Sequence, residues 1–580
     1  MRDIKRNEYE QAADGWGKVS ARASVAMDRV DQEMIATLQK SQRGKAAKAA
    51  LKDLGRLSRN FQYLHTECGL IRTALNGFAS ELAGPQRKVK QALENAESLG
   101  FTVKPDGSVE YPPSPLAPAP NAPGAGTARP GAPIPLLPGK GEGGGDANKG
   151  KAEEIAELLA TAVGEAAEIH SRYSEALSKL KAADGLEVTA RMWADAAKDI
   201  GAVRKAAGDY ADAKDIPKDK SPAENADWWR QLPQEQRDEF ATLYPASIGA
   251  LDGLPAEVRD EANRTVLRTT TADLELERAA LVSQKDRMGH YDRYGYQKAT
   301  RRIKAIDEDL KGLRSVQDHL DTAGQKDLPE LYLLGVDTEK EGHAIVSVGN
   351  PDTADNITTY VPGMNTDLEG IGKDIVRAEN FYLESSKHGA QGTKYASLMW
   401  LGYDAPQGPI SVASENRANA GAPVLNDFLD GLQASHQGPP ANDTVIGHSY
   451  GSLVTGKMLA GDETPPADAV IFIGSPGVGV DHARDLNLPP EAVWAGKAKN
   501  DLVAQLPTRT FWDPRDWGHR PFGTDPTSQE FGGNSFGVQD GNKLPPFSAH
   551  SLYWDEYSES LRNMGLIANG EYPTSGARSE

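Results

Sequence analysis

One serine of the chain lies in a pattern typical of catalytic nucleophiles. Residues 447–451 read Gly-His-Ser-Tyr-Gly, which places a glycine two positions before and two positions after Ser449. Residues 444–446 are β-branched and apolar, as in a buried strand, and residues 453–459 carry apolar side chains at helical spacing. A serine at a tight strand-to-helix turn projects its hydroxyl above the sheet, where it can attack an acyl carbon. We therefore predict that Ser449 is a nucleophile; the alternative is a serine that only turns the chain.

A serine hydroxyl needs a base, and the base needs an acid that orients it. Where a nucleophile follows a strand in this way, the chain order is serine, acid, histidine. The partners of Ser449 should therefore come later in the sequence. Asp501 lies just past a short apolar run at 492–495 and is the predicted acid. The alternative acids, which no predicted strand would position, are Asp513, Asp516 and Asp525.

Three histidines follow Ser449 and are candidates for the base. His482 precedes the acid, which is the wrong order. His550 lies in a loop that opens a final amphipathic helix, with Leu552 and Leu561 on one face, and is the predicted base. His519 remains the alternative.

Two backbone amides are needed to stabilise the oxyanion that forms when a serine attacks an acyl group. The N–H of Tyr450, directly after the nucleophile, is the first candidate. The second should come from the loop at 361–366, where Gly363 permits a sharp turn and Met364 or Asn365 offers its N–H. The alternative is an ordinary turn before a helix.

Short apolar runs alternate with helical segments from residue 330 onward. This alternation is typical of an α/β fold with a mostly parallel sheet, in which functional groups lie at the carboxyl ends of the strands. Helices are predicted at 367–385 and 423–432. The predicted strands are residues 331–336, 344–348, 357–361, 396–401, 444–446, 469–473 and 492–495.

The part of the chain before residue 330 is predicted to be all-α. Apolar side chains recur there at three- and four-residue steps, interrupted by a run rich in Pro, Ala and Gly that should be extended or flexible. The predicted domains are a helical hairpin or bundle (1–104), a Pro/Gly-rich linker (105–150), a helical region (151–325) and an α/β domain (326–580).

The bulk composition excludes several functions. The net charge of −19 is poorly suited to binding nucleic acid or anionic lipid. The single cysteine, Cys68, excludes an internal disulfide and a cysteine zinc site. No His/Asp/Glu cluster has metal-ligand spacing, and no cofactor is expected. No apolar run could span a bilayer and no ordinary signal peptide is visible, so we expect a cytoplasmic protein, or one exported by another route.

Several short motifs occur over about residues 225–565. They are Asp227-Trp-Trp229, Ile248-Gly-Ala-Leu-Asp-Gly-Leu-Pro255, Arg259-Asp-x-Ala-Asn-Arg264, Val361-Pro-Gly363, Gly447-His-Ser-Tyr-Gly451, Gly474-Ser-Pro-Gly477 and His550-Ser-x-Tyr553. Together they resemble the motifs of a family of actinobacterial α/β-hydrolases of mostly undefined function. The resemblance implies an α/β-hydrolase fold with a Ser449/Asp501/His550 triad, preceded by helical segments, and it implies no particular substrate.

The sequence therefore predicts a serine hydrolase that cleaves a carboxylic ester, or a related acyl bond of a small molecule, with residues 511–536 covering the site as a lid. The rival hypothesis is a non-catalytic binding or type VII secretion-linked protein that uses the hydrolase fold as a scaffold. Trp16-Gly17 loosely resembles the WXG-type hairpins of that secretion system. On this hypothesis the N-terminal helices would bind a helical protein partner.

Overall fold

The computed structural model describes residues 1–113, 125–131, 147–180, 188–288, 292–321, 327–412, 414–504, 522–545 and 547–573. The chain forms two compact units. The first comprises residues 1–23, 64–185 and 197–215, and the second comprises residues 24–63, 186–196 and 216–580. These boundaries differ from the predicted domains because the chain passes between the units inside continuous helices such as α3 (Lys45–Glu81), whose apolar pattern does not change there.

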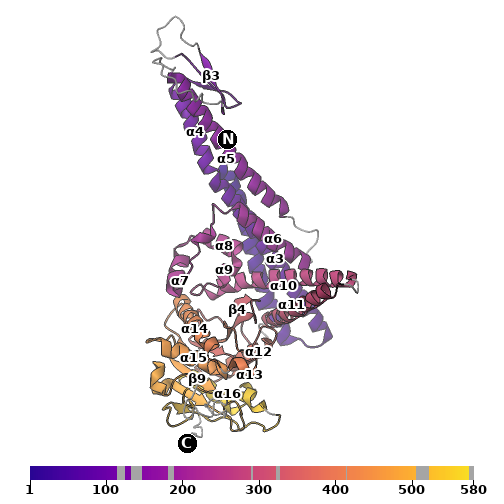
Figure 1. Ribbon diagram of the computed structural model, residues 1–580, viewed down its shortest axis with the longest axis vertical. Helices are drawn as coiled ribbons and strands as arrows, with labels where there is room; N and C mark the ends of the chain where they lie inside the picture. Colours follow the sequence, from indigo (N-terminus) through magenta and orange to yellow (C-terminus); the bar gives the residue numbers. More distant parts are fainter. Residues whose placement is uncertain are drawn as a thin grey trace. The chain divides into compact units, whose positions relative to one another are not determined.

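The first unit consists of helices and one small antiparallel sheet (Figure 1). Helices α4 and α5 pack on each other, and strand β2 packs on α5. Strands β2 and β3 lie inside the predicted linker 105–150, where Val109 and Tyr111 are buried in the core of this unit. The elements that lie wholly or partly in this unit are α1 (Arg6–Asp28), α3, α4 (Ala83–Ser98), β1 (Thr102–Val103), β2 (Val109–Tyr111), β3 (Gly126–Ala128), α5 (Ala147–Lys179), α6 (Ala190–Ala206) and the 3-10 turn η2 (Ala213–Asp215).

Helices also precede the large sheet of the second unit. Two of them, α10 and α11, pack on each other. The helices are the π-helix η1 (Arg29–Ile35), α2 (Ala36–Ser41), α7 (Pro222–Gln231), α8 (Gln234–Leu243), α9 (Pro245–Gly249), α10 (Ala256–Arg287) and α11 (Arg293–Leu320).

The second unit is built on an eight-stranded sheet with the order β11-β10-β9-β8-β6-β7-β5-β4. Strand β5 runs antiparallel to both of its neighbours, and the other pairs of adjacent strands are parallel. The short edge strand β11 has no counterpart in the prediction. The strands are β4 (Leu331–Asp337), β5 (His343–Val348), β6 (Asn356–Val361), β7 (Tyr395–Leu401), β8 (Asn442–His448), β9 (Ala469–Ile473), β10 (Val493–Gly496) and β11 (Asn534–Ser535).

Helices cover both faces of this sheet. The chain moves one way along the sheet from β6 through α12 to β7, and the opposite way from β7 through α14 to β8. Because such crossovers are right-handed, α12 and α14 lie on opposite faces. Helix α16 packs on α12, and α15 packs on α14. The remaining elements are α12 (Gly372–Ser385), α13 (Gly408–Val412), α14 (Asn416–Ser435), α15 (Tyr450–Gly461), η4 (Ala483–Leu486), η5 (Pro490–Ala492), η6 (Ser548–Trp554) and α16 (Glu559–Ala568).

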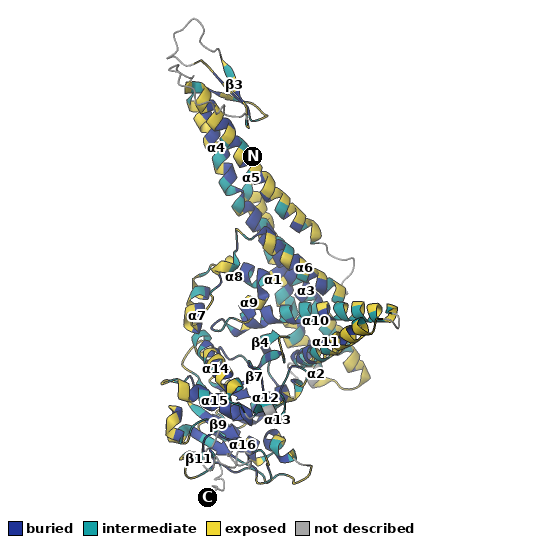
Figure 2. Ribbon diagram, viewed as in Figure 1, coloured by how far each residue is buried: buried dark blue, intermediate teal, exposed yellow. Residues whose placement is uncertain are grey.

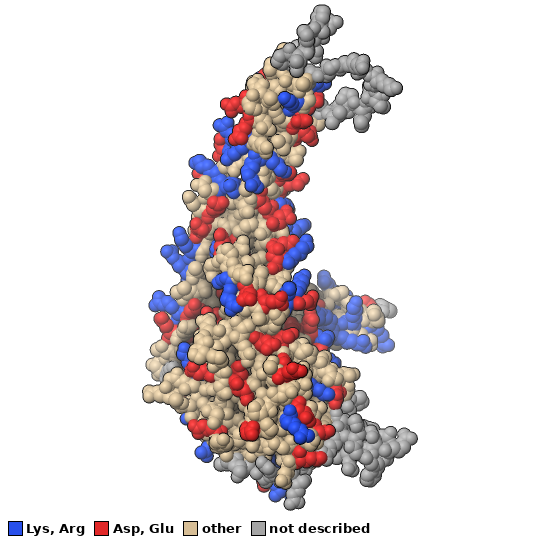
Figure 3. All heavy atoms as spheres, turned by 90° about the vertical axis from the view of Figure 1, so that its left-hand side faces the viewer, with Lys and Arg blue, Asp and Glu red and all other residues tan. Residues whose placement is uncertain are grey.

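The predicted fold class is confirmed: a helical N-terminal region precedes a mostly parallel sheet. Strand residues such as Leu398, Met399 and Ile446 are fully buried, and Figure 2 shows the strands and the facing sides of their helices as buried. The chain has a net charge of −19. On the face seen in Figure 3, acidic and basic side chains are intermingled, and the acidic side chains form no single patch.

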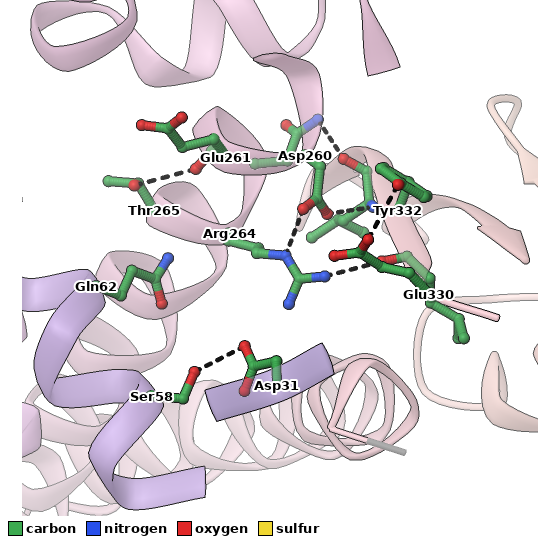
Figure 4. A network of polar contacts seen from close by, with 12 residues as sticks. Asp31, Ser58, Gln62, Asp260, Glu261, Arg264, Thr265, Glu330 and Tyr332 are labelled. Carbon is green, nitrogen blue, oxygen red and sulfur yellow. Dashed lines mark hydrogen bonds and ion pairs between the residues drawn. The ribbon is translucent and has the colours of Figure 1, made fainter. Parts of the chain in front are cut away.

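Polar side chains from residues 24–63 lie beside a buried ion pair of α10 in the second unit (Figure 4). Arg264 on α10 donates to Asp260 at 2.6 Å and to the carbonyl of Leu331 at 2.8 Å. Asp31 on η1, which accepts a hydrogen bond from Ser58 Oγ at 2.8 Å, faces the same guanidinium. Burial raises the pKa of Asp31 and of Asp260 to about 6, against the opposing attraction of Arg264.

We predict that Arg264→Leu costs about 3–5 kcal/mol at pH 8, since Asp260 is left buried and charged without its partner. The loss should shrink at pH 5, because a carboxyl whose pKa is about 6 is then neutral. The control is Arg278→Leu on the same helix, which breaks an exposed pair with Asp307 and should cost far less than Arg264→Leu. Urea unfolding followed by circular dichroism measures both. Equal losses in the free energy of unfolding for the two variants would contradict the conclusion that Arg264 neutralises a buried Asp260.

Candidate active site

Four neighbouring parallel strands end at one edge of the sheet, and the predicted site residues follow them. The last residues of β6, β8, β9 and β10 are in register, since Val361 pairs with Gly447 and Ile473 pairs with both His448 and Gly496. The loops after these strands carry Gly363, Ser449, Gly474 and Asp501 in turn. Residues distant in sequence are therefore brought to one edge.

Ser449 forms a sharp turn between β8 and α15. Its backbone has φ 56° and ψ −127°, a conformation that non-glycine residues rarely adopt and that costs about 1–3 kcal/mol. The Ser449 N–H donates to the carbonyl of Ile473 at 3.0 Å, which ties the turn to the neighbouring strand. A Cβ on Gly451 would lie 2.2 Å from the carbonyl oxygen of Val361, so this position must be glycine. The chain therefore turns sharply from β8 into α15 at Ser449, with glycine required close by.

Asp501 and His550 form a hydrogen-bonded pair at the same edge. The Nδ1 atom of His550 lies 2.9 Å from Oδ2 and 3.0 Å from Oδ1 of Asp501. Because a carboxylate only accepts, Nδ1 carries a proton and Nε2 of neutral His550 has a free lone pair. His550 lies in the 3-10 turn η6, and not at the start of the amphipathic helix α16, which begins later at Glu559.

The carboxylate of Asp501 is fully buried and has further donors. Tyr553 Oη donates to Oδ2 at 2.6 Å, and the N–H groups of Val503 and Ala504 donate to Oδ1 at 2.9 and 3.3 Å. Burial raises the pKa of Asp501, but the hydrogen bond and charge of His550 and the Tyr553 hydroxyl outweigh it and hold this pKa below its ordinary value. No role for Tyr553 is predicted from the sequence, although its spacing from His550 is part of the family motif.

Gly474 makes room for this pair. Its φ is +55°, and a Cβ there would lie 3.0 Å from both Asp501 Oδ2 and His550 Cε1. The glycine-rich loop that begins at Gly474 therefore lies against the acid and the histidine, which explains the absence of a side chain.

Ser449 and His550 both border the peptide that joins Ile473 to Gly474. No hydrogen bond joins Ser449 Oγ to the His550 ring among the residues that the structure describes. Ser449 is 6% exposed and the side chain of His550 is 15% exposed. In enzymes without bound substrate such contacts are often long and shorten only in the complex, so the pairing of these two residues stays a prediction.

The loop after β6 lies against the turn at Ser449. A Cβ on Gly363 would be 2.7 Å from Ser449 Cβ and 3.0 Å from Tyr450 N. The Asn365 N–H donates to the carbonyl of Pro406 at 3.0 Å, so it is not available to an oxyanion. No such bond from the Met364 N–H is found in the described part of the chain. Tyr450 and Met364 thus remain as the two candidate donors.

The other residues that the sequence offers as an acid or a base for Ser449 either have partners elsewhere or lie outside the described residues. Asp525, an alternative acid, pairs with Lys497 at 2.9 Å. Nδ1 of His482 lies 3.2 Å from the carbonyl oxygen of Glu530. Asp513, Asp516, His519 and the first part of the predicted lid (511–521 of 511–536) lie outside the described residues. Over the described ranges there is no cluster of three or more acidic, histidine or cysteine side chains suited to a metal ion. None of the helices in these ranges is long and apolar enough to cross a bilayer.

Comparison with known proteins places these features in a family. A family model described as alpha/beta hydrolase matches residues 337–510. Uncharacterized protein Rv0963c of Mycobacterium tuberculosis (strain ATCC 25618 / H37Rv) is 33% identical over 204 residues, which are 34% of this chain and 74% of that protein. The chain belongs to this alpha/beta hydrolase family.

A longer relative is Uncharacterized protein Rv2079 of the same strain, 30% identical over 370 residues, which are 59% of this chain and 55% of that protein. The chain thus spans about half the length of Rv2079. No solved structure matches the chain. The relatives support the resemblance to actinobacterial hydrolases of undefined function, and the matched segment includes β5 to β10 and Asp501.

We predict that Tyr553→Phe destabilises the protein by about 1.5–3 kcal/mol, because the buried Asp501 carboxylate loses a donor. Tyr557→Phe is the control, since Tyr557 is 89% exposed and its loss should change stability by less than about 0.5 kcal/mol. Urea unfolding of both variants at pH 7.5 makes the comparison. If Tyr553→Phe were as stable as the control, the hydroxyl would not be holding the carboxylate.

Proposed function

We propose that the chain is a serine hydrolase that cleaves a carboxylic ester, or a related acyl bond of a small molecule, with Ser449, His550 and Asp501 as its catalytic residues. The observation that carries the proposal is the Asp501–His550 pair at the same sheet edge as the strained turn of Ser449. A strained serine is kept in a fold where its position is needed. Membership of the alpha/beta hydrolase family supports hydrolysis in general.

In the proposed reaction, Nε2 of His550 takes the hydroxyl proton while Ser449 Oγ bonds to the acyl carbon. Asp501 keeps the ring in the Nδ1-protonated tautomer and stabilises the imidazolium that forms. The oxyanion is bound by the N–H groups of Tyr450 and Met364, which together lower the barrier by several kcal/mol. The imidazolium returns its proton to the leaving alcohol, leaving an acyl-enzyme.

The second half of the reaction repeats the first with water. His550 takes a proton from water, the hydroxide oxygen bonds to the acyl carbon, and the Ser449–acyl bond breaks as the proton returns to Oγ. The products are a carboxylic acid and free Ser449.

We predict that the wild-type chain is labelled by a fluorophosphonate and hydrolyses short p-nitrophenyl esters, and that Ser449→Ala does neither. His550→Ala and Asp501→Asn should lower kcat by about 10³-fold or more, because the serine loses its base or the base its correct tautomer. Ser386→Ala, an exposed serine outside the site, is the control and should match wild type. Mass spectrometry locates the label and steady-state assays give kcat.

The rival function, a non-catalytic or secretion-linked scaffold, makes the opposite prediction. A folded wild-type chain would then take no label at Ser449, and the three substitutions would leave any residual ester cleavage unchanged. Circular dichroism of each variant separates this result from loss of folding.

A further inference from the structure

His448, the residue between Gly447 and the predicted nucleophile, contacts the predicted base. Its Nε2 lies 2.9 Å from the main-chain carbonyl oxygen of His550, across 102 positions of sequence. The two imidazole rings are 4.7 Å apart between centroids and inclined by 32°. His448 is 5% exposed, so its contacts are made inside the protein. His448, the last residue of β8, is thus hydrogen-bonded to the main chain of His550.

The protonation state of His448 follows from its surroundings. Burial, and then the positive charges of His550 and Arg377, hold the pKa of His448 well below its ordinary value, against a weaker opposing effect of Asp501. The ring is therefore neutral and carries one proton. A carbonyl oxygen can only accept a hydrogen bond, so that proton must be on Nε2.

Packing alone does not require a histidine at this position. The His448 ring also contacts the rings of Tyr360 and Tyr553, at centroid distances of 6.5 and 6.0 Å. Phenylalanine would fill the same aromatic space. What a histidine adds is the N–H donor to the His550 carbonyl, which would otherwise lose a partner beside the active-site turn η6.

The turn η6 is held from two sides by hydrogen bonds that meet at His550. On one side, Asp501 binds the His550 ring and the Tyr553 hydroxyl. On the other, His448 binds the His550 main chain. A ring fixed only at Nδ1 could still pivot about that bond, and a shift of about 1 Å in a reacting group can cost 10²-fold in rate.

We propose that His448 is a positioning residue: through its Nε2–H it fixes the main chain of His550, so that the base is held beside both Asp501 and Ser449. The inference rests on the proposed function, because it assigns His448 a part in keeping that base in place. On this proposal His448 acts on the reaction only through His550.

Two variants separate the hydrogen bond from the packing. His448→Phe keeps an aromatic ring but has no donor, whereas His448→Gln places an amide N–H close to the position of the imidazole Nε2. We expect His448→Phe to lower kcat roughly 10- to 100-fold with KM changed less than about twofold, and His448→Gln to recover most of kcat although it packs less well. His436→Phe is the control: it removes a histidine whose ring nitrogens lie 3.1 and 2.9 Å from the carbonyl oxygens of Pro351 and Pro439, outside the site, and should leave kcat unchanged.

Nuclear magnetic resonance of the ¹⁵N-labelled histidine rings gives a readout that does not depend on turnover. His448 should be found as the neutral Nε2–H tautomer from pH 8 down to pH 5, and His448→Phe should shift the Nδ1–H resonance of His550. A charged or Nδ1-protonated His448 would overturn the proposal. So would a folded His448→Phe variant with the kcat of wild type, or a His448→Gln variant no better than His448→Phe.

Failure of the proposed function would look different. In that case the wild-type chain would show neither labelling nor hydrolysis, whatever the tautomer of His448. If the wild type is active and Ser449→Ala is not, the results for the His448 variants bear on the positioning role alone.

Discussion

A fully buried carboxylate must be matched by donors, and in this protein that requirement falls on Asp501. Its oxygens accept from an imidazole, a phenol and two backbone amides, which come from both its own loop and the turn η6. Pairing the acid therefore also brings His550 to the sheet edge from a late part of the chain. Gly474 leaves the space in which the pair fits. The local backbone around the site is arranged to satisfy this one charge.

The strained backbone of Ser449 is the second constraint on the site. The turn is stabilised by parallel pairing on both sides of β8 and by the burial of α15 beneath it. An apolar sheet core thus offsets the cost of an unfavourable backbone conformation at its edge. Because the strands beside β8 also end here, the same core positions the Gly363 loop and Gly474 against the serine. The stability of the sheet and the geometry of the site are consequently linked.

Much of the site could be predicted because its signals are local. The Gly-x-Ser-x-Gly run with a strand before it and a helix after it predicts the turn at Ser449, and chain order points to Asp501 and His550. Features that depend on distant contacts were not predictable. The choice between the Met364 and Asn365 amides depends on a bond from Asn365 to Pro406, and the role of Tyr553 depends on where η6 packs. Likewise, the charge of Arg264 acts on Asp31 across more than 200 positions of sequence, which no helical periodicity reveals.

The proposed mechanism requires that His550 and the two oxyanion donors surround an acyl group on Ser449 Oγ. A crystal structure of the chain after reaction with a fluorophosphonate tests this directly. The account predicts phosphorus bonded to Ser449 Oγ, with the phosphoryl oxygen within hydrogen-bond distance of the Tyr450 and Met364 amides and with His550 Nε2 beside the adduct, its Nδ1 still on Asp501. A phosphoryl oxygen turned away from both amides, or an imidazole remote from the adduct, would contradict it.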